Sequence, residues 1–271
     1  MADRRLSALT VGVAVLLAVW ILRDAIGALT HHVRIDNARM HPVSVDARST
    51  AAVAAPSTAP AAGSFTPTPV QPPPELSYLD QLARADIRRR VRASAGYTFL
   101  NEIVEESADS ALHRWDDRST RPVRVYLAED SVPNLQPAFL AAVRTAFDRW
   151  EDAGVPVRFD LNADSSVAEV AIHWRERFDI ERTGQTDLAW DPEGRIERAL
   201  ITIATFDPEG RPLSPDDVRV VALHEIGHLL GLDHSADSTD VMFPKTRVRD
   251  LSPRDIRTAL LLYQLAPGSL R

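Results

Sequence analysis

The chain has 271 residues, of which 45% are hydrophobic and 25% are charged, so it has the composition and the length to form a hydrophobic core of its own. Its formal net charge of −7 and isoelectric point near 5.6 provide no attraction for nucleic acid, and we expect no nucleic-acid partner. The sequence contains no cysteine, which excludes disulfides, a thiol nucleophile and thiolate metal ligands. Any bound metal must therefore be held by His, Asp or Glu, and eight histidines are present.

The first 23 residues have the pattern of a membrane-targeting segment. Two arginines, Arg4 and Arg5, precede an uncharged and mostly apolar run over residues 6–22. The length of this run lies between that of a signal peptide and that of a spanning helix, which needs roughly 17–25 apolar residues. We expect a membrane anchor, with the arginines in the cytoplasm and the rest of the chain in the periplasm or outside the cell. The alternative is a cleaved signal peptide, which predicts a secreted protein.

Two segments separate this N-terminal region from the main domain. Residues 24–76 are rich in Ala, Pro, Ser and Thr and have no apolar period, which predicts a disordered Pro/Ala-rich linker. Residues 77–114 predict a helical extension, because apolar residues recur there at helical spacing. These apolar residues form two stripes: Leu79, Leu82, Ile87 and Val91, then Phe99, Leu100, Ile103 and Val104.

Residues 115–271 have the length of one domain and alternate between strand and helix patterns. The predicted strands are Pro122–Ala128, Val157–Leu161, Val167–Trp174, Asp187–Asp191 and Ile196–Ala204. The predicted helices are Pro137–Ala153, Ser214–Leu230 and Ser252–Leu265. Each of the last two begins with a serine cap followed by Pro and, three residues after the cap, Asp. The mixture of elements predicts an α+β domain.

Three of the eight histidines lie in one short motif, HEIGHLLGLDHS, which runs from His224 to Ser235. His224 and His228 are four residues apart on a predicted helix, so they project from the same face. Gly231 is suited to end the helix and turn the chain, which brings His234 to the metal from outside the helix. Three neutral imidazoles leave a fourth coordination position open, which is typical of a catalytic zinc site.

Glu225 follows the first histidine, where its carboxylate can reach a water on the metal without becoming a ligand. By chance, HExxH alone arises in about one chain in a hundred of this length, and adding Gly231 and His234 at fixed offsets reduces this to about one in a hundred thousand. The isolated histidines His113 and His173 fit structural roles instead. The motif therefore predicts a metal site.

The long histidine motif followed by a methionine resembles the metzincin proteases, and Met242 lies where their Met-turn methionine is placed. Ser235, directly after the third histidine, and the segment from Val241 to Pro244 are similar to the matrixin branch, the relatives of matrix metalloproteinases. The resemblance extends loosely over residues 115–265, and the short form with a helical extension is similar to bacterial members. It implies a zincin-like domain with a twisted mixed sheet, a long helix packed on it, an active-site helix and a C-terminal helix. Met242 would form an apolar floor beneath the ligands.

The resemblance also implies how a peptide or protein substrate is held. An extended substrate would pair with the edge strand that contains Leu188, Ala189 and Trp190. The specificity pocket would be walled by Pro244 and the residues after it. Three cations follow in that wall and favour an acidic or polar substrate side chain: Lys245, Arg247 and Arg249.

Two departures from the family pattern limit what is carried over. Matrixins usually have a structural zinc and calcium sites before the active-site helix, but residues 179–204 contain no histidine. We therefore expect one catalytic zinc and neither a second zinc nor calcium. Animal members are kept latent by a propeptide cysteine, which this chain lacks, so any latency would be steric, for instance through the helices of residues 77–113.

The predicted function is that of a zinc metalloendopeptidase, in which Glu225 is the general base for a zinc-activated water. The alternative is a zinc-holding surface module that binds a partner without hydrolysing it. Glu225 favours the enzyme, because a binding module has no use for a carboxylate next to the water on the metal.

Overall fold

The structure is a computed structural model, and it describes residues 31–35, 76–106 and 110–270. The predicted membrane segment, residues 1–23, lies outside the described residues, as does most of the predicted linker. Among the helices that are described, none is both long enough and apolar enough to cross a membrane.

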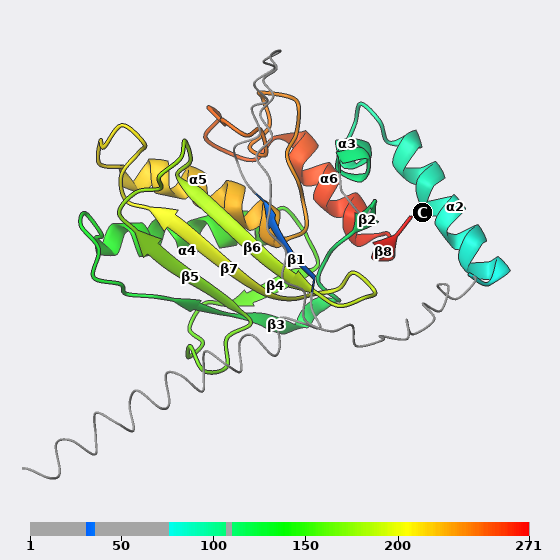
Figure 1. The fold of residues 1–271 in the computed structure, drawn as a ribbon, viewed down its shortest axis with the longest axis horizontal. Coiled ribbons are helices and arrows are strands. Elements are labelled where there is room, and N and C mark those ends of the chain that lie inside the picture. Colours follow the sequence, from blue (N-terminus) through cyan, green and yellow to red (C-terminus); the bar gives the residue numbers. More distant parts are fainter. Residues whose placement is uncertain (1–30, 36–75, 107–109, 271) are drawn as a thin grey trace, which may run out of the picture.

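Six strands form one mixed sheet in the order β1-β6-β7-β5-β3-β4 (Figure 1). The neighbours β7, β5, β3 and β4 are parallel to one another, whereas β6 is antiparallel to both β7 and β1. The six strands are His31–Ile35 (β1), Arg118–Leu127 (β3), Val157–Asp160 (β4), Val170–Arg175 (β5), Gly184–Trp190 (β6) and Ile196–Ala204 (β7). A second, two-stranded sheet pairs β2 (Ala111–Leu112) with β8 (Gly268–Ser269).

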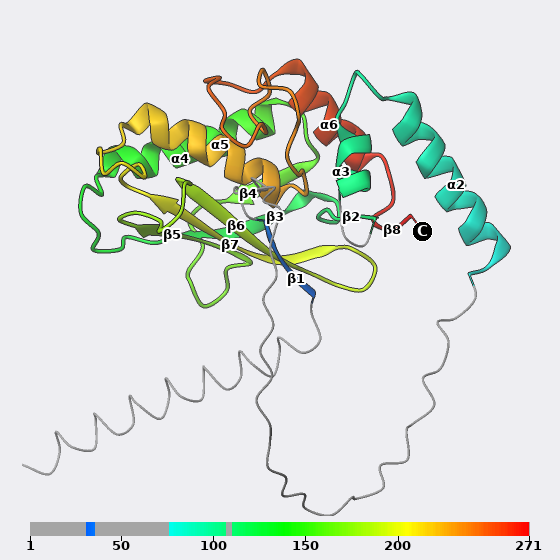
Figure 2. The same ribbon diagram turned by 45° about the horizontal axis from the view of Figure 1, so that its top comes forward.

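Helices cover one side of the large sheet, as Figure 2 shows for α4 and α5. The five helices of the described residues are Tyr78–Ala93 (α2), Leu100–Glu106 (α3), Pro137–Asp152 (α4), Pro215–Leu229 (α5) and Pro253–Tyr263 (α6). The long helix α4 and the motif-bearing helix α5 pack against each other, and α5 also contacts β6 and β7. The mixed sheet with its packed helices confirms the predicted α+β class.

The packing of α4 follows directly from its sequence. Phe139, Val143, Phe147 and Trp150 recur at helical spacing, and all four are buried in the core. Trp150 also donates a hydrogen bond from Nε1 to the Leu223 carbonyl of α5, over 2.9 Å. The same apolar face that the sequence predicts therefore holds the motif-bearing helix in position.

Serine caps begin α5 and α6, as predicted. Ser214 and Ser252 each accept a bond from the backbone N–H three residues later, and Asp217 and Asp255 bond back to the cap residue. These are complete capping boxes, and each satisfies N–H groups that a helix start leaves without intrahelical partners. The helix start is thus set by local sequence.

The helical extension differs from its prediction at its C-terminal end. It forms α2 and α3, but Ala111–Leu112 is a strand, because it pairs with Gly268–Ser269 near the C-terminus. The extension packs beside α6 (Figure 1), where the backbone N–H of Phe99 donates to Thr258 Oγ1 over 3.1 Å. None of its described residues is among those that line the pocket next to the histidine motif, and steric latency through these helices stays a prediction.

Candidate metal centre

The structure brings the three motif histidines together, although His234 lies outside the helix that carries the other two. One ligand nitrogen from each of His224, His228 and His234 lies within 4.8 Å of the others. His224 and His228 are buried, whereas His234 is partly exposed. The three rings therefore share one point at which a single ion can be held.

The hydrogen bonds of the two helical histidines direct their other nitrogens to that point. Nδ1 of His224 donates to the Val241 carbonyl over 2.7 Å, and Nδ1 of His228 donates to the Leu232 carbonyl over 2.9 Å. A carbonyl only accepts, so in each neutral ring the proton is on Nδ1 and Nε2 carries the lone pair with which a metal is bound. The two Nε2 atoms are 3.1 Å apart. Two nitrogen ligands that each lie about 2.05 Å from a tetrahedral zinc ion would be about 3.3 Å from each other, so this pair of nitrogens fits zinc.

The environment keeps these imidazoles neutral. Burial, with a contribution from the nearby His234, lowers the pKa of His224 to about 3. Burial also lowers the pKa of His228 well below its ordinary value, and that of His234 in the same direction. A metal ligand must be deprotonated, so the metal-free site is already in the binding form at neutral pH.

Gly231 turns the chain at the end of α5 and brings His234 back to the site. Its φ is +96°, in the left-handed region that glycine adopts without penalty. A Cβ at this position would lie 1.9 Å from the backbone oxygen of His113, so the turn is also tightly packed. The sequence-based role of Gly231 as helix terminator agrees with this geometry.

The Met-turn lies beneath the ligands and is tied to them. Met242 is fully buried, and a Cβ on Gly227 would lie 2.2 Å from its sulfur, so the methionine packs directly against α5 between the two helical histidines. The backbone N–H of Ser235 donates to the Met242 carbonyl over 3.0 Å. This bond joins the residue after His234 to the Met-turn, so the loop of the candidate third ligand is connected directly to the segment of Met242.

Glu225 is held next to the histidines by β6. Its side chain is 1% exposed, and its Oε2 accepts a hydrogen bond from Thr186 Oγ1 over 2.6 Å. Gly184 makes room for it, because a Cβ there would lie 2.2 Å from Glu225 Oε1. Sequence reasoning found neither residue, because no motif marks Thr186 and the predicted strand begins at Asp187, three residues after Gly184.

A partly buried ionic network supports the loop that carries His234. Arg254 of α6 donates to Ser235 Oγ over 2.8 Å and to Asp240 Oδ2 over 2.7 Å. Its other guanidinium nitrogen bonds to Glu102 of α3, which also accepts from the backbone N–H of Ala236 over 3.0 Å. Through Glu102, the helical extension thus contacts the loop that follows His234. No local pattern in the sequence predicts the contacts of Glu102 with Ala236 and Arg254.

The residues predicted to hold substrate lie at two places beside the metal centre. Leu188, Ala189 and Trp190 are in β6 with buried side chains, so only their backbone can face a peptide. In this structure β1 occupies the other side of β6, with residues His31–Ile35 opposite Thr186–Trp190. The predicted edge strand is therefore the second strand of the sheet. Pro244 lines a pocket that also includes His224.

The two histidines set aside as structural have other partners. His173 Nδ1 lies 3.1 Å from Asp130 Oδ2, and its ring is about half exposed. His113 stacks on Trp190, with the ring centroids 3.9 Å apart. Neither histidine belongs to the group around the candidate metal site.

An HExxH helix, a third histidine beyond a glycine turn and a methionine turn beneath them define the metzincin class. The sequence profile of one family, described as Matrixin, matches residues 114–264, which is more than half of the chain. The chain belongs to the matrixin family.

Named relatives are plant and animal metalloproteinases. Metalloendoproteinase 1-MMP of Arabidopsis thaliana is 35% identical over 64% of this chain and 48% of its own length. Metalloendoproteinase 1 of Glycine max is 29% identical over 63% of this chain and 56% of its own length. Matrilysin of Felis catus is 52% identical over 16% of this chain and 18% of its own. The chain thus spans about half the length of the two plant relatives, and the similarity to bacterial members stays a prediction.

Proposed function

We propose that this matrixin is a zinc-dependent endopeptidase that hydrolyses peptide bonds with Glu225 as the general base. The observation that carries the proposal is the convergence of His224, His228 and His234 with a buried carboxylate beside them. A zinc ion held by the three imidazoles would supply the Lewis acid that polarises the scissile carbonyl and acidifies the attacking water. The donor set of three neutral nitrogens suits zinc and leaves a position for that chemistry.

Glu225 takes the proton from the water and delivers it to the leaving amine. Its position supports both transfers, because the Thr186 hydroxyl donates to one carboxylate oxygen and keeps the side chain in one orientation. Thr186 belongs to β6, so the base and the strand proposed to hold the peptide are joined by this bond. Proton transfer and substrate alignment therefore depend on the same strand.

The substrate is an extended peptide that pairs with β6 through its main chain. The side chains of Leu188, Ala189 and Trp190 are buried, so recognition at this strand is by backbone hydrogen bonds and carries little sequence preference. A peptide in this position must take the place of β1, which pairs with the same residues. The side-chain preference is assigned to the pocket beside Pro244.

The proposal is tested with the Glu225→Gln variant of the full chain and a casein substrate. The amide has nearly the shape of the carboxylate but cannot accept the proton, so we expect retained zinc and at least a 1,000-fold loss of kcat, on the order of known losses for catalytic groups. Zinc content by elemental analysis and casein cleavage are measured together. Chelation should abolish wild-type cleavage, and added zinc should restore it. A wild-type chain that holds zinc but cleaves nothing would favour the non-catalytic binding module.

We also propose that the catalytic domain lies outside the cytoplasm, anchored by residues 1–23. The charge pattern of Arg4 and Arg5 before an apolar run motivates this. Fractionation of expressing cells should find the full chain with membranes and accessible to protease from outside the cytoplasm. Recovery of a chain that has lost these residues from the medium would favour the secreted alternative.

A further inference from the structure

A pocket of about 760 Å³ opens directly beside the metal centre, between α5 and the chain that follows the Met-turn. Its wall includes the ligand His224 and the residues from Pro244 to Arg249, and Val220 and Val221 of α5 supply an apolar part. A peptide whose scissile bond lies at the metal would place a neighbouring side chain in this pocket. The charges of the wall therefore bear on which side chain is accepted.

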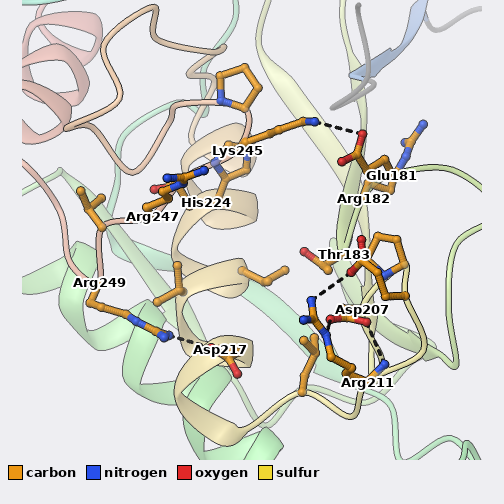
Figure 3. Close-up of a pocket in the computed structure, with 18 of the residues that line it drawn as sticks. Glu181, Arg182, Thr183, Asp207, Arg211, Asp217, His224, Lys245, Arg247 and Arg249 are labelled. Carbon is orange, nitrogen blue, oxygen red and sulfur yellow. Dashed lines mark hydrogen bonds and ion pairs between the residues drawn. The ribbon is translucent and has the colours of Figure 1, made fainter.

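The pocket is rich in charge, and almost all of it is compensated internally (Figure 3). Lys245 is bound to Glu181 over 2.9 Å. Arg211 is bound to Asp207 over 2.6 Å and to Glu209 over 3.1 Å. On the opposite wall, Asp217 is the remaining acid of the pocket, and it is bound to Arg249 over 2.8 Å. Each carboxylate that lines the pocket is thus paired with a cation, and Asp207 and Glu209 share Arg211.

Arg247 is different from the other cations of the wall. It is exposed, and within the described part of the chain no hydrogen bond or ion pair to its guanidinium is found. Arg247 and His224 both line the pocket, and their side chains overlap in the view of Figure 3. The acids that line the pocket already have partners, so a carboxylate from outside the protein is the natural counter-ion for this guanidinium.

We propose that Arg247 is the specificity-determining residue of this pocket and selects peptides with a glutamate or aspartate next to the cleaved bond. The inference rests on the proposed peptidase function and adds the class of substrate. It also distinguishes among the three cations Lys245, Arg247 and Arg249, which the sequence alone does not. Lys245 and Arg249 form ion pairs with acids of the pocket, whereas Arg247 does not. A substrate carboxylate can accept two parallel bonds from a guanidinium, which favours an acid over its neutral amide.

The test begins with the wild-type full chain and a peptide library. Sequencing of the products gives the residue preference on both sides of the cleaved bond, and the best sequence is then made as a pair that differs only by Glu or Gln at the selected position. We expect the Glu peptide to have about fivefold higher kcat/KM, the ratio that a partly exposed ion pair supports. The preference should weaken as salt is raised.

Three variants assign the preference to Arg247. Arg247→Gln should bring the Glu to Gln ratio close to one, and Arg247→Glu should reverse it and favour a basic side chain. Arg121→Gln is the matched control, because Arg121 is another exposed arginine, lies in β3, and does not line the pocket. A Glu to Gln ratio that Arg247→Gln leaves unchanged would overturn the inference.

A binding measurement separates this inference from the peptidase proposal. The same two peptides, labelled with a fluorophore, are titrated into zinc-loaded Glu225→Gln protein with and without Arg247→Gln. A Kd ratio that favours the Glu peptide and is lost with Arg247→Gln supports the inference even if the wild-type chain cleaves nothing. Equal Kd values for the two peptides contradict it even if the wild-type chain is an active peptidase.

Discussion

Adjacent residues of the motif have separate tasks because of the helical rotation between them. His224 and His228 lie one turn apart and face the same point, whereas Glu225 is rotated by about 100° and meets β6 instead. Burial then decides the chemical state of the histidines. Each Nδ1 donates to a backbone carbonyl, and each pKa is lowered, so the rings are neutral and oriented before a metal arrives.

These lowered pKa values predict how acid affects the metal-free protein. In the unfolded chain a histidine titrates near pH 6.5, so below that pH the unfolded state binds protons that the folded state excludes. The free energy of unfolding should therefore be greatest above about pH 6.5. It should fall as the pH drops toward 4, by about 1.4 kcal/mol per pH unit for each fully buried histidine.

Urea unfolding of metal-free protein between pH 4 and pH 8 measures this slope. Burial raises the pKa of Asp255, and the proton that this carboxyl takes up in the folded protein acts in the opposite direction, so the wild-type slope is compared with that of a variant that lacks one histidine. A His228→Gln control should have a smaller slope than the wild type. Equal slopes in the two proteins would show that His228 is not the source.

At the scale of elements, α5 and the turn that ends it place the third ligand. The helix start is set locally by the Ser214 capping box, but the helix end depends on a tertiary contact as well as on glycine. At Gly231 the backbone is left-handed and passes close to the His113 carbonyl. The Ser235 to Met242 bond then joins the returning loop to the Met-turn.

The Gly231→Ala variant should be strongly destabilised and should lose zinc affinity. The added Cβ would lie 1.9 Å from a backbone oxygen, in addition to the left-handed strain, and we expect a loss of about 3 kcal/mol. Gly154→Ala is the matched control, because its φ is +85° and nothing lies within 4 Å of the added Cβ. That control should lose only about 1–2 kcal/mol. Thermal unfolding and zinc titration of both variants are the measurements, and similar losses in the two would exclude the steric contact as the cause.

At the scale of the whole molecule, the helical extension belongs to the same core as the elements that carry the candidate metal site. Phe99 and Leu100 are fully buried in one hydrophobic cluster with Trp115 and Leu262. Glu102 reaches the loop after His234. The family match begins at residue 114, so it does not include this support.

Two truncations test how far the folded unit extends. A chain of residues 77–271 should unfold cooperatively, because it keeps α2, α3 and the apolar residues that α6 covers. A chain of residues 115–271 should be several kcal/mol less stable, on the order of the cost of removing large core side chains, and should bind zinc more weakly. Circular dichroism melting and zinc titration compare the two. If the shorter chain matches the longer one in both measurements, the extension is not part of the folded unit.

Local sequence determined most of the elements and the candidate metal ligands of this protein. The helical period places His224 and His228 on one face, glycine permits the turn at Gly231, and serine caps mark the starts of α5 and α6, so each of these features depends on neighbours within a few residues. Only the tertiary structure decided the contacts between distant segments. Thr186 meets Glu225 because β6 lies beneath α5, and Ala111–Leu112 is a strand because residues 268–269 pair with it.

The same distinction applies to the charges around the site. In the sequence, Lys245, Arg247 and Arg249 are equivalent cations on one loop. Folding brings Glu181 to the first and Asp217 to the third, from segments dozens of residues away. An ion pair depends on distances of a few ångströms across the fold, and the spacing of residues along the chain does not specify those distances.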